Sequence, residues 1–149
     1  VRKLQMAKSD EEKEADLQNI PDPVKRQARK ETMEKGIDAP IVMNSLRKAG
    51  EFLDQLEANI EDSGWIAGDK FSMADACTLP YIQRLDHLAL SEAFSEEKRP
   101  KINKWYKKVK DLNFFDKAVT SQIPPPLVEM MNAFGEEVKD KALTLMEEN

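Results

Sequence analysis

The stretch from Trp65 to Leu90, WIAGDKFSMADACTLPYIQRLDHLAL, carries the strongest structural signal in this chain. A loop that contains Gly68 is followed by a short polar segment up to Asp75 and then by a mostly apolar run. In the polar segment Ser72 lies three residues before Asp75, which is the spacing of a capping box. In a capping box each of the two side chains accepts a hydrogen bond from the backbone N–H of the other residue. We expect these two residues to begin a helix that reaches about Leu90, with the Asp75 carboxylate at the positive end of the helix dipole.

Two further features modify this predicted helix. Phe71 precedes the cap, where a hydrophobic staple contacts the fourth helical residue, here Ala76. Because Ala76 is small, the staple is expected to be weaker than usual. Pro80 falls inside the helix, removes one backbone hydrogen bond and kinks the axis. The kink either shapes a pocket at Leu79 to Tyr81 or only accommodates packing.

Helix signals continue toward the N-terminus of the chain. A capping box at Ser9 predicts a short helix over residues 10–19, and Asp22 is a good N-cap for a second helix that reaches about Lys35. Gly36 is expected to end that helix, because glycine adopts a left-handed C-terminal cap at little cost.

Three amphipathic patterns account for most of the remaining chain. The first covers residues 38–60 and repeats apolar residues at steps of four and three: Val42, Leu46, Ala49, Leu53, Leu56 and Ile60. The second begins at Pro100 and places on one face Ile102, Trp105, Tyr106, Val109 and Leu112. The third follows an extended connection at residues 124–126 and carries Leu127, Met131, Phe134, Val138 and Leu145. Sustained strand alternation is missing, so the sequence predicts an all-α bundle of five to seven helices.

Length and composition fit one globular domain over residues 1–149. The net charge of −5 argues against general nucleic-acid affinity. No apolar run approaches the roughly 18 residues that a membrane span needs. The single cysteine, Cys77, excludes a disulfide framework and a cysteine-based metal site and suggests a reducing compartment, so we expect a cytoplasmic protein.

The stretch from Trp65 to Leu90 resembles the C-terminal all-helical domain of glutathione S-transferases. There a Gly-x-x-aromatic-Ser-x-Ala-Asp box begins the buried central helix, and the matching residues here are Gly68, Phe71, Ser72, Ala74 and Asp75. The resemblance extends over nearly the whole chain. The break at residues 20–23 and the pieces at residues 79–81 and 84–88 are more particularly similar to a bacterial group of transferases related to lignin β-etherases.

The resemblance implies a division of labour between two domains. In this family the glutathione site and the catalytic hydroxyl or thiol belong to an N-terminal thioredoxin-like domain, whereas the helical domain contacts the hydrophobic substrate. No strand pattern precedes Val1, and Val1 to Lys8 already has helical character. We therefore expect a chain that lacks the thioredoxin-like domain and the leading turns of its first helix.

The function implied by the resemblance is the hydrophobic electrophile half-site of a transferase. The parent activity would be glutathione conjugation or thiolytic ether cleavage, with glutathione as co-substrate of the parent protein. This chain alone is expected to be inactive, without a catalytic residue, cofactor or metal. Expected partners are a hydrophobic small molecule, a thioredoxin-like domain or further copies of the chain, with no nucleic acid and no membrane. The alternative is a non-catalytic protein–protein interaction module of the same fold.

Individual side chains are candidates for the substrate site. Tyr81 is expected as a polar group lining the cleft. Met130, Met131 and Phe134 either cap a hydrophobic ligand or pack in the core. Cys77 is expected to be a small buried hydrophobe, because no general base accompanies it nearby in sequence.

The remaining polar signals are expected to be structural. His87, the single histidine, has no nucleophile or orienting partner on its helix face, so we expect a structural or surface role. A run of basic residues is flanked by acidic ones and is expected to be a solvated helix face: Lys98, Arg99, Lys101, Lys104, Lys107, Lys108 and Lys110.

Overall fold

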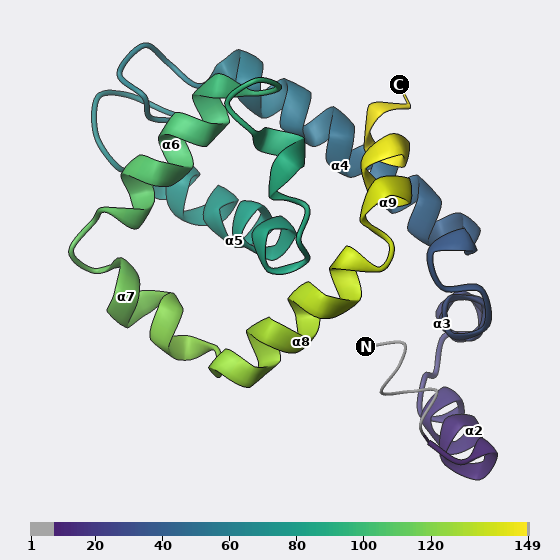
Figure 1. The fold of residues 1–149 in the computed structure, drawn as a ribbon. Coiled ribbons are helices and arrows are strands. Elements are labelled where there is room, and N and C mark those ends of the chain that lie inside the picture. The colour runs from purple at the N-terminus through teal and green to yellow at the C-terminus, as the bar shows by residue number, and fades with distance from the viewer. Residues whose placement is uncertain (1–7, 149) are drawn as a thin grey trace.

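The computed structural model describes residues 8–148, and this range is helical with no β-strand (Figure 1). The α-helices within it are α2 (Asp10–Gln18), α3 (Pro23–Lys35), α4 (Pro40–Asn59), α5 (Met73–His87), α6 (Pro100–Lys110), α7 (Phe115–Ala118), α8 (Pro125–Glu136) and α9 (Lys139–Glu147). Short 3₁₀ turns join some of them: η1 (Gly36–Asp38), η2 (Ser91–Phe94) and η3 (Thr120–Gln122). The predicted all-α bundle is confirmed, with eight α-helices in the described residues where five to seven were expected. The helix expected over Val1 to Lys8 falls outside the described residues, except for Lys8 itself.

The two N-terminal helices begin and end close to their predicted positions. At the start of α2 the Ser9 backbone N–H donates to the Glu12 carboxylate at 2.9 Å, and the Glu12 N–H donates to the Ser9 hydroxyl at 3.2 Å. The Asp22 side chain caps α3 by accepting from two backbone N–H groups. Gly36 ends α3 with φ of 61°, a positive value that glycine adopts without a Cβ penalty.

The core forms where α4, α5 and α6 pack together. Leu53 of α4, Ile82 of α5 and Trp105 of α6 are each 0% exposed. The apolar stripes predicted for α4 and α6 supply much of this core, since Ile102 and Val109 are also fully buried. Helix α5 buries one face against its neighbours and exposes the other, so it is central without being fully enclosed.

The C-terminal part differs from the prediction of one last helix. The chain bends at Glu137 and Val138, so that α8 packs against α5 and α9 packs against α4 (Figure 1). Both contacts need glycine: a Cβ at Gly135 would overlap the Leu88 carbonyl, and a Cβ at Gly50 would overlap the Met146 carbonyl. The extended connection expected at residues 124–126 is shorter, because Pro125 already begins α8.

Arg99 departs from the solvated basic face expected for its neighbours. Its side chain is buried, with 8% of the residue exposed. The guanidinium donates to the Asp54 carboxylate at 3.0 and 2.7 Å and also to the Ala93 carbonyl. Arg99 therefore joins α4 to η2 just before α6 begins, a role that the run of lysines around it conceals in the sequence.

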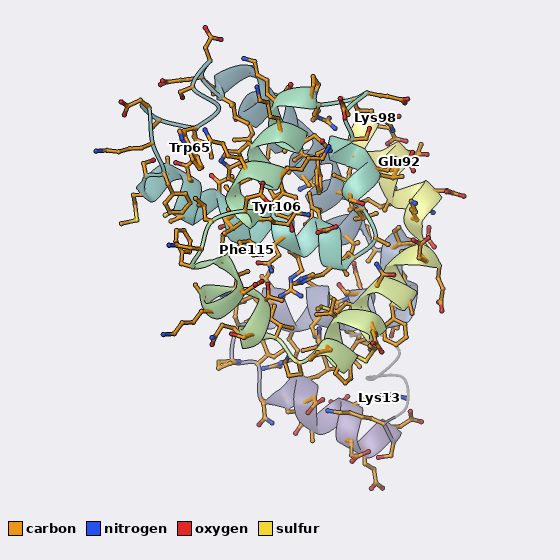
Figure 2. All side chains as sticks on the ribbon, turned by 60° about the vertical axis from the view of Figure 1, so that its left-hand side comes forward. Lys13, Trp65, Glu92, Lys98, Tyr106 and Phe115 are labelled. Carbon is orange, nitrogen blue, oxygen red and sulfur yellow. The ribbon has the colours of Figure 1, made fainter. Side chains whose placement is uncertain are left out.

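Surface ion pairs hold α9 near η2. Lys98 lies between Glu147 at 2.5 Å and Glu92 at 3.7 Å, and Lys139 lies 3.6 Å from Glu92. Figure 2 shows Lys98 and Glu92 close together beside α9. Such exposed pairs contribute little individually, so the buried helix contacts carry most of the attachment. Among residues 8–148 no helix is long and apolar enough to span a membrane.

Candidate functional site

The start of α5 is organised around one buried carboxylate. Asp75 is 0% exposed. One carboxylate oxygen accepts the backbone N–H of Ser72 at 2.9 Å and its hydroxyl at 2.8 Å. The other accepts the Trp105 indole N–H at 2.8 Å and the Ile66 backbone N–H at 3.1 Å. The predicted capping box is present, and Asp75 also ties the preceding loop and α6 to the start of α5.

The hydrogen bonds to Asp75 favour the charged form of its carboxyl group. Burial by itself raises the pKa of this carboxyl, but the hydrogen bonds from Ile66, Trp105 and Ser72 outweigh burial, and the pKa lies below its usual value. Every donor around the carboxylate is used for the fold. This position therefore serves structure and offers no group to a substrate.

Phe71, the first residue of the predicted staple, also belongs to an aromatic cluster. The Phe71 ring lies 5.8 Å from the Trp65 ring and 5.3 Å from the Phe114 ring, both in edge-on geometry. Ala76 is exposed and borders the same hollow as Phe71. The two rings supply the apolar contacts that a methyl group cannot.

The four predicted substrate contacts do not come together. Tyr81 is 67% exposed, and its ring lies 5.9 Å from that of Phe52. Met131 is buried, with its sulfur 2.7 Å from an Arg84 guanidinium nitrogen, and Met130 is half-buried. Phe134 is the one of the four that lines a cavity described below.

Phe134 lines an apolar cavity of about 330 Å³, which we call the Phe134 pocket. It lies where the end of α3 and η1 meet α4, α8 and α9. Apolar side chains provide most of the lining: Ile37, Val42, Leu46, Phe134, Val138 and Ala142. Lys35, Asp38 and Glu137 supply charges, and Asp38 is paired with Lys141.

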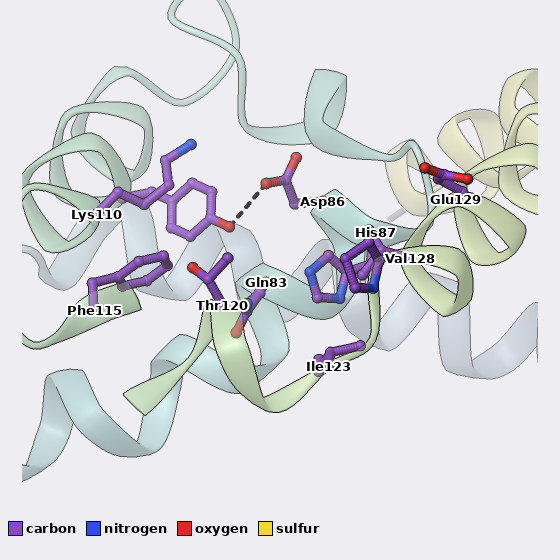
Figure 3. A pocket seen from close by; sticks show the side chains of 11 residues that line it. Gln83, Asp86, His87, Lys110, Phe115, Thr120, Ile123, Val128 and Glu129 are labelled. Atoms are coloured by element: carbon purple, nitrogen blue, oxygen red, sulfur yellow. Dashed lines mark hydrogen bonds between the residues drawn. The ribbon is translucent and has the colours of Figure 1, made fainter. Parts of the chain in front are cut away.

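A second cavity of about 420 Å³ lies at the other end of α5 from the capping box, and we call it the His87 pocket (Figure 3). The last turn of α5, together with α6, α7, η3 and α8, lines it. Inside it the Tyr106 hydroxyl donates to the Asp86 carboxylate at 2.9 Å. The Lys110 ammonium lies 4.4 Å from the centre of the Tyr106 ring.

Two titratable groups of the His87 pocket are shifted toward their neutral forms. Burial and the neighbouring Asp86 carboxylate raise the pKa of the Tyr106 hydroxyl. Burial lowers the pKa of His87 from its ordinary value of 6.5, against the opposing effect of Asp86. His87 is therefore uncharged near neutral pH and lines a pocket, which the sequence analysis did not predict.

The prediction that Cys77 is buried is wrong. Cys77 is exposed, because it lies on the side of α5 opposite the buried Asp75, Leu79 and Ile82. It shares that side with Met73, 77% exposed, and with Tyr81, at four-residue spacing. Among the described residues no group of three or more His, Cys, Asp or Glu side chains could hold a metal ion.

The paired Asp86 and Tyr106 are the contact that sequence reasoning missed. Tyr106 is predicted on the apolar face of its helix, and a buried tyrosine hydroxyl needs a hydrogen-bond partner. The sequence therefore predicts that the Tyr106 hydroxyl has a hydrogen-bond partner. It does not identify Asp86 as that partner, because Asp86 belongs to another helix.

A buried capping box at the start of a central helix, inside an all-helical bundle, is the arrangement of the helical domain of glutathione transferases. Residues 7–113 match the family described as glutathione S-transferase, C-terminal domain. The match covers more than half of the chain, so the chain belongs to this family. Comparison with curated proteins and with solved structures gave no match. Helices α7, α8 and α9 lie beyond the matched residues, and α8 contributes a wall to each of the two pockets.

Proposed function

We propose that this chain supplies the hydrophobic-substrate half of a glutathione transferase site, with the Phe134 pocket as the place where the apolar part of the substrate binds. The supporting observation is the pocket itself, a cavity of about 330 Å³ with a mainly apolar lining. Small-molecule sites are typically concave and apolar with a few polar groups. Each square ångström of apolar surface removed from water contributes about 25 cal/mol.

The glutathione half of the site is proposed to come from a thioredoxin-like partner domain. The exposed face of α5, formed by Met73, Cys77 and Tyr81, supports this proposal, because adjacent exposed apolar side chains are typical of a docking surface. The same face also favours the second candidate, a non-catalytic assembly module or a homo-oligomer. Light scattering over a range of protein concentrations tests the homo-oligomer, since only self-association raises the mass of the isolated chain.

The proposed parent reaction is attack by the glutathione thiolate on a hydrophobic electrophile, either conjugation or thiolytic cleavage of an aryl ether. This chain is proposed to be inactive on its own. Thiolate formation needs a donor held against the sulfur, whereas the buried Asp75 carboxylate is an acceptor and already binds donors from Ile66, Ser72 and Trp105. Conjugation of glutathione to a chloronitroaromatic acceptor should therefore not exceed the rate without protein. Saturable turnover by the isolated chain would contradict this.

Binding to the Phe134 pocket can be measured without a reaction. N-phenyl-1-naphthylamine, a neutral dye that fluoresces in apolar surroundings, should bind the chain. Val138→Trp fills the pocket and should abolish most of this fluorescence, because Val138 lines it. Val24→Trp is the matched control, since Val24 is 75% exposed on α3 and lies outside the pocket. Equal loss in both variants, or none in either, would exclude the pocket as the hydrophobic half-site.

A further inference from the structure

The His87 pocket has a chemistry different from that of the Phe134 pocket, and nothing in the proposed transferase function uses it. We propose that the His87 pocket is a binding site for a small protonated amine with an aromatic or aliphatic body. Three features of the pocket support this assignment: its walls, its charges, and an ammonium group already held at its edge.

The walls suit an apolar body. Phe115 of α7, Ile123 after η3 and Val128 of α8 line the cavity of about 420 Å³, opposite the last turn of α5. Figure 3 shows Phe115 at one side of the pocket and Ile123 at the other, with Gln83 of α5 between them. Phe115, Ile123 and Val128 follow the part of the chain that matches the family, whereas the α5 residues of the pocket lie inside it.

The charges favour a cation over an anion. Two carboxylates line the pocket, Asp86 on α5 and Glu129 on α8, against one ammonium, that of Lys110. His87 adds no charge near neutral pH. The C-terminal end of α5 contributes the negative end of its helix dipole in the same place. An anionic ligand would lose its water shell beside this excess of negative charge.

The position of Lys110 shows that an ammonium group is stable at this edge. Its nitrogen lies 4.4 Å from the centre of the Tyr106 ring, a cation–π distance. The Tyr106 hydroxyl points the other way and donates to Asp86 at 2.9 Å, so ring and carboxylate are held in one fixed arrangement. Asp86 on α5 and Glu129 on α8 both line the pocket, so a ligand amine bound there has two carboxylates as candidate partners.

Three probes of nearly equal shape test the charge preference: 1-naphthylmethylamine, 1-naphthylmethanol and 1-naphthoate. Calorimetry with the full 149-residue chain at pH 7 should rank them amine, alcohol, acid, from tightest to weakest. We expect about a fivefold step in affinity for each change of charge. An acid that binds as tightly as the amine overturns the proposal.

Two variants locate the binding. Glu129→Gln should weaken the amine about fivefold and leave the alcohol unchanged, because one of the two carboxylates is lost. Glu136→Gln on the same helix is the matched control, since Glu136 does not line the pocket. If Glu129→Gln binds the amine more tightly than the alcohol by the same factor as the wild-type chain does, the pocket carboxylates are not the cause of the preference, and the proposal is overturned.

A blocking variant tests the place independently of charge. Val128→Trp should weaken the amine and the alcohol alike by at least tenfold, whereas Leu127→Trp, at a residue 42% exposed and outside the pocket, should not. Circular dichroism confirms that each variant is folded. The Val138→Trp variant of the Phe134 pocket should retain amine binding, so the two pockets can fail separately. Amine binding unchanged by Val128→Trp excludes this pocket.

Discussion

Asp75 and Asp86 lie on the same helix, and their carboxylates have opposite relations to the rest of the molecule. Asp75 is fully buried and accepts from two backbone N–H groups, a hydroxyl and an indole. Asp86 is half-buried, accepts the Tyr106 hydroxyl, and borders cavities at the molecular surface. A carboxylate whose oxygens are all occupied by buried donors stabilises the fold, whereas a partly solvated carboxylate remains available to a ligand.

The energetic basis of this difference is the cost of burying polar groups. The donors around Asp75 include the indole N–H of the fully buried Trp105, which cannot turn to water when the carboxylate is removed. The donor to Asp86 lies at the wall of a pocket, where water can replace a lost partner. Loss of a hydrogen-bond partner should therefore be severe at the Asp75 end of α5 and mild at the Asp86 end.

The largest effect is expected for Asp75. Asp75→Ala should lower the free energy of unfolding by about 3–5 kcal/mol, because several buried donors lose their acceptor together. Asp75→Asn should be nearly as harmful, since its amide NH₂ would face donors. Urea denaturation followed by circular dichroism measures both. Ser72→Ala, which removes one donor, should cost about 1 kcal/mol.

Asp69→Ala is the control for these variants. Asp69 is an exposed acid in the loop before α5, and its loss should change stability by less than about 0.5 kcal/mol. If Asp75→Ala were as mild as Asp69→Ala, the buried network would not be what distinguishes the two ends of α5.

Acid should remove part of the same stabilisation. The folded-state pKa of Asp75 lies below its unfolded value, so the stabilisation is complete above the unfolded pKa of about 4 and declines as pH falls through the folded pKa. The effect is smaller than that of Asp75→Ala, because a protonated carboxyl still accepts hydrogen bonds.

This pH effect is measured as a difference between proteins. The stability gap between the wild-type chain and Asp75→Asn should narrow from pH 5 to pH 3, since only the wild-type chain titrates at this position. Ser72→Ala replaces Asp75→Asn if that variant does not fold, because fewer donors to the carboxylate leave a smaller pKa shift. A gap that stays constant over this range would show that the charge of Asp75 is not what stabilises the fold.

Several helix starts could be predicted from the sequence because they depend on residues close to the start itself. Prolines at positions 23, 40 and 100 begin α3, α4 and α6, as expected for the first helical residue. The break between α8 and α9 could not be predicted, because apolar residues continue at helical spacing through it. It follows from tertiary packing, in which α8 lies on α5 while α9 lies on α4.

The candidate sites are harder to predict, because their contacts join distant parts of the chain. The sequence indicates that the Trp105 and Tyr106 side chains need hydrogen-bond partners, but not that these are Asp75 and Asp86. Exposure presents the same difficulty: Cys77 has the sequence context of a core residue, and only the packing of α5 places it on the surface.

A moderate effect is expected at the Asp86 end of the helix. Tyr106→Phe should cost about 1 kcal/mol of unfolding free energy, the usual value of a single hydrogen bond, because the Asp86 carboxylate can still be hydrated. Thermal denaturation beside the wild-type chain measures the loss. A cost as large as that of Asp75→Ala would show that the two carboxylates are equally structural.

The smallest stability effect is expected at Cys77, two residues from Asp75. Two residues turn an α-helix by about 200°, so the thiol lies on nearly the opposite side from the buried carboxylate. Cys77→Ser should change the free energy of unfolding by less than about 0.5 kcal/mol. Ellman's reagent should label one thiol per native chain without urea, because the residue is exposed.

Labelling of Cys77 at several protein concentrations then tests the proposed docking face of α5. A rate that does not depend on concentration means that the Met73–Tyr81 side of α5 is open in the isolated chain, as a surface awaiting a thioredoxin-like domain requires. A rate that falls as concentration rises means that a second copy covers it, which supports self-association instead. A thiol that reacts only in urea at every concentration would contradict the exposed position of Cys77.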